Sequence, residues 1–270
     1  MSGHENFQLE LNIHDTDVHI SGMQRKGDRP ALLSLHGFGS TKEDYADLCM
    51  YPTFEGRDLV TYDAPGFGAS TLADPTKLSM SFLKDVALAV MDQLGIEKFH
   101  LSGHSMGGLS GLLLAHHHPE RCLSFMSIEG NVAPEDCFLS RQIVEYPASS
   151  AQEFMNNFRA RVAQRAEYGS GLYAQTLPWK VQASSAEPIF TSMVEVSDKE
   201  PLLDYIGSLP FRRAFIYGEQ NAALSYLPQL PALGVDAVEI PHSGHFPMYS
   251  NPPALWAAMA TFIDKADQNT

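Results

Sequence analysis

The chain has 270 residues, of which 44% are hydrophobic and 19% are charged, as in globular proteins that bury a sizeable core. It carries 32 acidic and 18 basic side chains, a formal charge of −14 that disfavours contact with nucleic acid or anionic membranes. No stretch approaches the ~20 consecutive apolar residues of a membrane span. We therefore expect neither nucleic acid as a partner nor insertion into a membrane.

The cysteines are Cys49, Cys122 and Cys137, an odd number without regular spacing. This arrangement forms neither a disulfide framework nor a metal-binding pair, which is typical of proteins in a reducing compartment. Residues 1–6 lack the basic and apolar regions of a signal peptide. We expect a cytoplasmic protein, and no oligomeric state is predicted.

The first half of the chain alternates between predicted strands and helices. Residues 7–13 and 17–23 alternate apolar and polar side chains, which predicts an antiparallel hairpin. Further strands are predicted at 30–35, 58–62, 98–101 and 122–128, and helices at 81–94 and 106–117. The short apolar strands between helices indicate a mostly parallel sheet that helices cover on both faces.

The pattern changes between about residues 130 and 208, where five prolines separate short segments and the helical stretch 150–165 is polar and amphipathic. Strands resume at 213–217 and 236–240, and a helix at about 253–265 ends the pattern. We therefore predict a core domain formed by residues 1–130 and 209–270, with a helical cap inserted at 131–208.

The sequence Gly103-His104-Ser105-Met106-Gly107 matches G-x-S-x-G and lies between a predicted strand and a predicted helix. In this context the motif predicts a tight turn that raises the serine hydroxyl above the sheet. Such a serine becomes a nucleophile when a base lies within hydrogen-bonding distance. A glycine-rich turn with an incidental serine is the alternative, which the strand–turn–helix context disfavours.

Four motifs in this order resemble the α/β-hydrolase family over nearly the whole chain: HGFG at 36–39, DAPGFGAS at 63–70, GHSMGG at 103–108 and SGHFP at 243–247. The resemblance implies an eight-stranded, mostly parallel sheet flanked by helices. It also implies a cap inserted after the sixth strand, where the interruption at 131–208 falls.

The resemblance also implies a base and an oxyanion hole. The loop after the last predicted strand carries His245, the expected general base, and His242 is the alternative. Backbone N–H groups of Phe38 and Met106 are expected to stabilise the negative charge of the tetrahedral intermediate. The ring of Phe38 can also line the site.

The acid that orients the histidine departs from the common pattern. Many relatives place an aspartate after the seventh strand, where this chain has Asn221, which cannot supply a negative charge. Some relatives place the acid after the sixth strand, and Glu129 occupies that position. We favour Glu129, with Glu219 as the alternative acid and a site built on Asn221 or another acid as a third possibility.

A serine, histidine and acid together imply an acyl-enzyme, and hence an ester, thioester, lactone or amide substrate. The expected function is a serine hydrolase acting on a small-to-medium, moderately hydrophobic carboxylic ester. A C–C bond hydrolase or a perhydrolase would use the same triad, and a non-catalytic ligand receptor is an alternative of another class. Haloalkane dehalogenases and epoxide hydrolases of this fold use an aspartate nucleophile, so Ser105 disfavours both.

No dinucleotide, phosphate-binding or metal motif accompanies these residues, so we expect no cofactor and no metal. The run His116-His117-His118 is interpreted as the end of a helix, because consecutive helical residues point in different directions. Apolar bulk in the predicted cap suggests a hydrophobic substrate or packing of the cap on the core. It comes from Phe154, Phe158, Tyr168, Tyr173, Trp179, Phe190 and Met193.

Overall fold

The computed structural model describes residues 3–268 and contains one sheet in the order β1-β2-β4-β3-β6-β7-β8-β9, with β5 beside β2. β1 and β2 form an antiparallel hairpin, β2 is antiparallel to β4, and every pair from β4 to β9 is parallel. The strands are β1 (Glu5–Ile13), β2 (Thr16–Arg25), β3 (Arg29–Leu35), β4 (Arg57–Tyr62), β5 (Thr71–Leu72), β6 (Phe99–His104), β7 (Cys122–Ile128), β8 (Arg212–Gly218) and β9 (Asp236–Ile240).

The predicted strands are all present, and the eight-stranded path has the expected mostly parallel arrangement. The ninth strand, β5, has only two residues and is too short to leave an alternating pattern in the sequence. Every residue of β6 is buried, as in a strand covered on both faces. The predicted segment 98–101 was too short at its end, because the strand continues to His104 and leads directly into Ser105.

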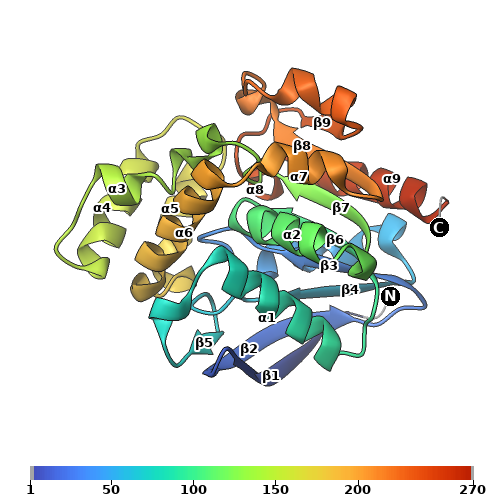
Figure 1. The fold of residues 1–270 in the computed structure, drawn as a ribbon, viewed down its shortest axis with the longest axis horizontal. Coiled ribbons are helices and arrows are strands. Elements are labelled where there is room, and N and C mark those ends of the chain that lie inside the picture. Colours follow the sequence, from blue (N-terminus) through green and yellow to red (C-terminus); the bar gives the residue numbers. More distant parts are fainter. Residues whose placement is uncertain (1–2, 269–270) are drawn as a thin grey trace.

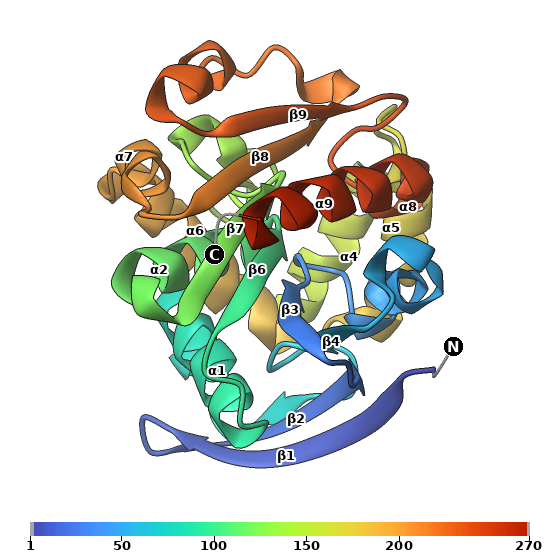
Figure 2. The ribbon, with the colours of Figure 1, turned by 90° about the vertical axis from the view of Figure 1, so that its right-hand side faces the viewer.

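Helices cover both faces of this sheet (Figure 2). α1 (Met80–Gln93), α2 (Met106–His117) and α7 (Leu202–Ser208) lie on one face, and α9 (Pro252–Asp267) lies on the other. α1 begins where the Ser79 hydroxyl accepts a hydrogen bond from the N–H of Phe82, a standard N-cap. The buried positions of α1 include Phe82, Val86 and Val90, which are four residues apart and therefore share one face of the helix.

The segment between β7 and β8 contains α3 (Gln142–Glu145), α4 (Ala151–Ala163), α5 (Ser170–Lys180) and α6 (Ala186–Lys199) before α7. Figure 1 shows α3 to α6 gathered beside the carboxyl ends of the central strands. The remaining short helices are η1 (Lys42–Met50), η2 (Pro52–Phe54), η3 (Pro75–Lys77), η4 (Pro119–Arg121), η5 (Pro134–Phe138), η6 (Ala183–Ser185), η7 (Glu219–Asn221), η8 (Leu227–Leu233) and α8 (Pro247–Ser250). Among the helices of residues 3–268, none has both the length and the apolar composition needed to cross a membrane.

The strand register places the ends of the central strands at one level. Leu35 of β3 pairs with Gly103 of β6, and His104 of β6 pairs with Ile128 of β7. The loops that follow β3, β6 and β7 therefore start side by side, under the helices of the β7–β8 segment. This is the edge at which open α/β sheets bind ligands.

Candidate active site

Ser105 lies on the turn between β6 and α2, with φ 50° and ψ −115°. A positive φ is unfavourable for a serine and requires small neighbours. A Cβ on Gly103 would lie 2.2 Å from the carbonyl oxygen of Gly107, and a Cβ on Gly107 would lie 2.5 Å from that of Leu35. The glycines of G-x-S-x-G therefore permit the turn, and the N–H of Ser105 holds it by donating to the carbonyl of Ile128 at 2.9 Å.

His245 lies in the loop between β9 and α8, and its ring faces the serine. Its Nε2 is 3.0 Å from the Oγ of Ser105, and its Nδ1 is 3.2 Å from the Oε2 of Glu129. The alternative histidine, His242, is 80% exposed, and its Nδ1 is 3.6 Å from an oxygen of Glu219. The structure thus brings Ser105, His245 and Glu129 together and leaves Glu219 paired with His242 outside this group.

Glu129 directly follows β7 at φ 50° and is buried. Its Oε1 accepts a hydrogen bond from the N–H of Gly218 at 2.6 Å. Its Oε2 accepts one from the Nδ2 of Asn221 at 2.7 Å. Asn221, at the position where the family resemblance implies an aspartate, therefore holds the carboxylate of Glu129 rather than replacing it.

Burial governs the protonation of the pair formed by His245 and Glu129. It lowers the pKa of His245, and the nearby Arg165 lowers it further, while Glu167 raises it. Burial raises the pKa of Glu129, against the hydrogen bonds from Gly218 and Asn221. A neutral imidazole with Nδ1–H facing Glu129 leaves Nε2 free to accept the proton of Ser105, which is the state that a general base requires.

The loop after β3 carries Phe38, one of the two residues expected to form the oxyanion hole. The Nε2 of His36 accepts a hydrogen bond from the N–H of Ala64 at 2.8 Å, and its Nδ1 donates to the carbonyl of Gly37 at 2.8 Å. His36 thereby fixes the loop that contains Phe38. Met106, the other expected residue, is the first residue of α2, where a helix leaves its N–H groups without intrahelical partners.

Two further residues that sequence reasoning did not single out support these loops. The Nε2 of His104 donates to the carbonyl oxygen of His245 at 2.7 Å and ties the turn of Ser105 to the loop of His245. The carboxylate of Asp63 accepts hydrogen bonds from the N–H of Lys42 at 2.9 Å and from the N–H of Ala69 at 2.9 Å. His104 stands inside the GHSMGG motif and Asp63 begins the DAPGFGAS motif, so their place in these motifs was the signal that the sequence offered.

A small cavity of about 10 Å³ lies against the serine. This volume holds roughly one water molecule. Its lining residues come from the core loops and from the segment between β7 and β8: Phe38, Ser105, Asp136, Leu139, Ser140, Tyr173, Phe190, Met193 and His245. Phe154 and Phe158 pack behind this wall and are buried, whereas Tyr168 and Trp179 are exposed and contribute nothing to it.

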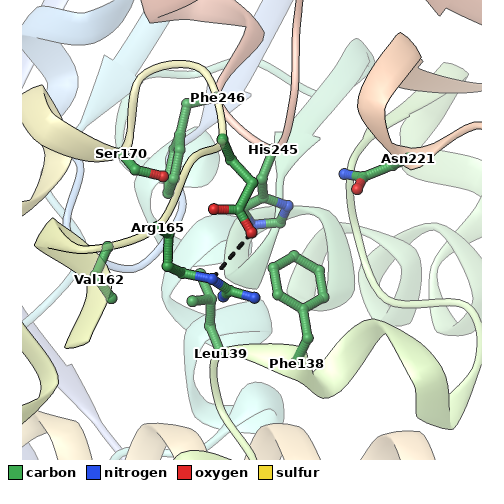
Figure 3. A pocket seen from close by; sticks show the side chains of 9 residues that line it. Phe138, Leu139, Val162, Arg165, Ser170, Asn221, His245 and Phe246 are labelled. Carbon is green, nitrogen blue, oxygen red and sulfur yellow. Dashed lines mark ion pairs between the residues drawn. The ribbon is translucent and has the colours of Figure 1, made fainter.

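A larger pocket of about 110 Å³ reaches His245 from another side. Figure 3 shows Phe138, Arg165 and Asn221 around the histidine. The Nε of Arg165 lies 2.9 Å from a carboxylate oxygen of Glu167, and these two side chains are about one-third exposed. This pocket therefore connects the histidine with partly exposed polar side chains.

The structure shows no metal-binding arrangement of three or more His, Cys, Asp or Glu side chains within residues 3–268. His116 stacks on Tyr205 with ring centroids 3.7 Å apart, and the Nδ1 of His117 lies 2.8 Å from the carbonyl oxygen of Leu113. The three cysteines are buried and free.

Comparison with known proteins agrees with this architecture. The chain is 27% identical over 268 residues to the pimeloyl-acyl-carrier protein methyl ester esterase of Aeromonas hydrophila, covering 89% of this chain and 98% of that protein. It shares its fold with the N-acyl homoserine lactonase AidH complexed with N-hexanoyl homoserine (TM-score 0.76, 19% identity, 98% of each chain). A carboxylesterase of Nitrososphaera gargenis has the same fold (TM-score 0.77, 13% identity, 97% of this chain and 100% of that one). Residues 30–167 match the sequence model of the alpha/beta hydrolase fold, and the chain belongs to this family.

Proposed function

We propose that this hydrolase cleaves a small-to-medium, moderately hydrophobic carboxylic ester, thioester or lactone through an acyl-enzyme on Ser105. The observation that carries the proposal is the continuous line of contacts from Ser105 to His245 and on to Glu129, at 3.0 and 3.2 Å. A serine becomes nucleophilic when a base accepts its proton and an acid orients that base.

In the first half of the reaction, the Nε2 of His245 accepts the hydroxyl proton while the Oγ of Ser105 attacks the carbonyl carbon. Glu129 faces the imidazolium that forms, and the N–H groups of Phe38 and Met106 are the proposed donors to the oxyanion. The C–O bond of the ester then breaks, and His245 gives its proton to the leaving oxygen. In the second half, His245 takes a proton from the water that attacks the acyl carbon. The bond between that carbon and the Oγ of Ser105 then breaks, and His245 returns the proton to Oγ as the acid is released.

The apolar walls of the cavity favour a substrate with a hydrophobic acyl group. Phe38, Leu139, Phe190 and Met193 supply apolar surface beside Ser105. The Aeromonas relative that aligns over nearly its whole length is an esterase, which favours ester chemistry here as well. The receptor alternative drew its support from Asn221 in place of an aspartate, and Glu129 provides the missing carboxylate.

The test is hydrolysis of p-nitrophenyl acetate, butyrate and octanoate by the wild type and by Ser105→Ala, with Ser208→Ala as the matched control. Ser208 lies at the exposed end of α7, away from the site. We expect Ser105→Ala to lose at least about 1,000-fold in kcat, since the hydroxyl forms the covalent intermediate. Ser208→Ala should match the wild type.

Labelling by a fluorophosphonate gives a second measurement on the same proteins. An activated serine reacts irreversibly, so the wild type should be labelled and Ser105→Ala should not. Equal hydrolysis by the wild type and Ser105→Ala, or a wild type that neither hydrolyses these esters nor is labelled, would contradict the proposal.

A further inference from the structure

Two buried hydroxyl groups near Ser105 have no hydrogen-bond partner among residues 3–268. The Oγ of Ser140 and the phenolic oxygen of Tyr173 are enclosed, and neither forms a hydrogen bond within the described part of the chain. Ser140 is 2% exposed and Tyr173 is 0% exposed. Burying a hydroxyl without a partner is unfavourable, and such groups are rare in folded proteins unless a ligand or water pairs with them.

Both residues line the small cavity that is also lined by Ser105 and His245. Tyr173 lies on α5 with its ring stacked on Phe246, the neighbour of His245, at a centroid distance of 4.3 Å. The edge of the ring also lies against Gly39, where a Cβ would be 2.4 Å from the Cε2 of Tyr173. The phenol is therefore fixed between the base loop and the loop that carries Phe38.

The two pockets at His245 correspond to the two halves of an ester. His245 has to protonate the leaving oxygen, so the leaving group lies on its side of the site. The larger pocket, lined by His245, Phe138 and the partly exposed Arg165, suits that half. The smaller cavity is lined by the nucleophile Ser105, which assigns it to the acyl half, and an acyl chain bound there has to widen it beyond its present one-water volume.

We propose that Ser140 and Tyr173 bind a hydroxyl group on a short, uncharged acyl chain, so that the preferred substrates are hydroxyacyl esters. This inference rests on the proposed ester hydrolysis. A serine and a tyrosine hydroxyl can each donate and accept, and so together they can satisfy both the proton and the lone pairs of an alcohol. Among the nine described residues that line the cavity there is no lysine or arginine to pair with a carboxylate on the acyl chain.

The remaining polar side chain of the cavity is already occupied. The Oδ1 of Asp136 accepts a hydrogen bond from the hydroxyl of Tyr226 at 2.8 Å. Its Oδ2 accepts from the N–H groups of Val132 and Ala133 at 2.8 and 2.9 Å. Asp136 thus shapes the wall, and the unpaired hydrogen-bonding capacity lies with Ser140 and Tyr173.

The test compares two esters of nearly equal shape, p-nitrophenyl 3-hydroxybutyrate and p-nitrophenyl 3-methylbutyrate, in which a hydroxyl replaces a methyl group. We expect the wild type to prefer the hydroxy ester by at least about tenfold in kcat/KM, because a site built to pair a hydroxyl discriminates against the analogue that lacks it. Tyr173→Phe and Ser140→Ala should each reduce this ratio several-fold, and the double variant should abolish it.

The controls are Tyr205→Phe and Ser208→Ala, whose hydroxyls lie at exposed sites on α7. Both should keep the wild-type ratio. A variant that is merely damaged lowers both rates together and leaves the ratio unchanged. A wild type that hydrolyses the two esters equally well, or a ratio that survives in the double variant, would overturn the inference while leaving ester hydrolysis intact. Hydrolysis of neither ester would overturn both proposals.

Discussion

Glu129 is held from three directions, by the ring of His245, the N–H of Gly218 and the amide of Asn221. Such donors fix the rotamer of the carboxylate, so that Oε2 stays at the distance the imidazole needs. The backbone contributes as well, because the φ of 50° directs the residue away from the line of β7. The hydrogen-bond donors and the backbone conformation together give Glu129 this orientation.

Replacing Glu129 by glutamine should lower kcat by about 100- to 10,000-fold, because the isostere removes the charge that stabilises the imidazolium and orients the ring. KM for p-nitrophenyl butyrate should change little. Glu219→Gln is the matched control, since Glu219 lies 3.6 Å from the exposed His242, whereas the carboxylate at His245 is that of Glu129. Near-normal turnover in Glu129→Gln together with a loss in Glu219→Gln would reverse the assignment of the acid.

The sequence was informative about these residues to different degrees. The turn around Ser105 could be predicted because its geometry demands glycines at fixed spacing. The choice between Glu129 and Glu219 could not be settled, because it depends on where the loops after β7 and β8 lie relative to His245. The sequence leaves open a site built on Asn221, whereas in the structure the amide of Asn221 donates to Glu129, a contact that only the folded arrangement reveals.

Among the elements, α5 and α6 show why the segment between β7 and β8 was the hardest to predict. Prolines were interpreted as breaks, yet Pro178 lies inside α5. The carbonyl of Ala174, which Pro178 cannot bond, accepts a hydrogen bond from the Nε of Arg159 at 3.1 Å on α4. Pro188 is tolerated in the first turn of α6, where its missing N–H costs nothing. Prolines alone therefore do not show where these helices end, because a tertiary contact compensates for the hydrogen bond that Pro178 cannot form.

The end of α5 is joined to the core by a partly buried ion pair. The Nζ of Lys180 lies 2.8 and 2.9 Å from the two carboxylate oxygens of Asp44 in η1 and 3.0 Å from the hydroxyl of Tyr249. That hydroxyl also donates to Asp44 at 2.8 Å. The side chains of Lys180 and Asp44 are 16% and 10% exposed, so water does little to screen their attraction.

Lys180→Met should therefore lower the free energy of unfolding by about 1–3 kcal/mol, because it leaves Asp44 buried with one fewer donor. Lys199→Met is the matched control: its partner Glu195 is 3.6 Å away and both side chains are more than half exposed, so a change within about 0.5 kcal/mol is expected. Urea unfolding of the three proteins measures the difference. Equal losses in the two variants would show that the Lys180 pair adds no stability beyond that of a surface pair.

At the scale of the whole molecule, the site depends on bringing together residues from positions 36, 105, 129 and 245. The carboxyl ends of parallel strands meet at one edge, and this rule made the convergence predictable once the strands were placed. The alternation of apolar strands and helices predicted a sheet between two layers of helices, since strands that are apolar on both faces must be covered on both sides. The depth and polarity of the cavity could not be predicted in this way, because they depend on how α5 and α6 pack over that edge.

The core also buries several histidines, which makes its stability depend on pH. Burial lowers the pKa of His100 to about 4 and that of His104 to about 3. Burial also lowers the pKa of His36. The unfolded chain takes up protons at these positions as pH falls through 6.5, whereas the folded chain does not, so stability is lost as the pH decreases. Glu129 and Asp136 act in the opposite sense, because burial raises the pKa of each carboxyl group.

The contribution of His100 to the loss of stability at acid pH can be separated from that of the other buried histidines by comparing variants. Its Nδ1 lies 2.8 Å from the hydroxyl of Ser124 and its Nε2 2.9 Å from the carboxylate of Asp267, so glutamine can keep part of this pairing without titrating. Between pH 7 and pH 5, the wild type should lose about 2 kcal/mol more unfolding free energy than His100→Gln. Urea unfolding at both pH values measures this, with His118→Gln on the surface as the control. If the wild type, His118→Gln and His100→Gln lost the same stability over this interval, His100 would not be a source of the acid sensitivity.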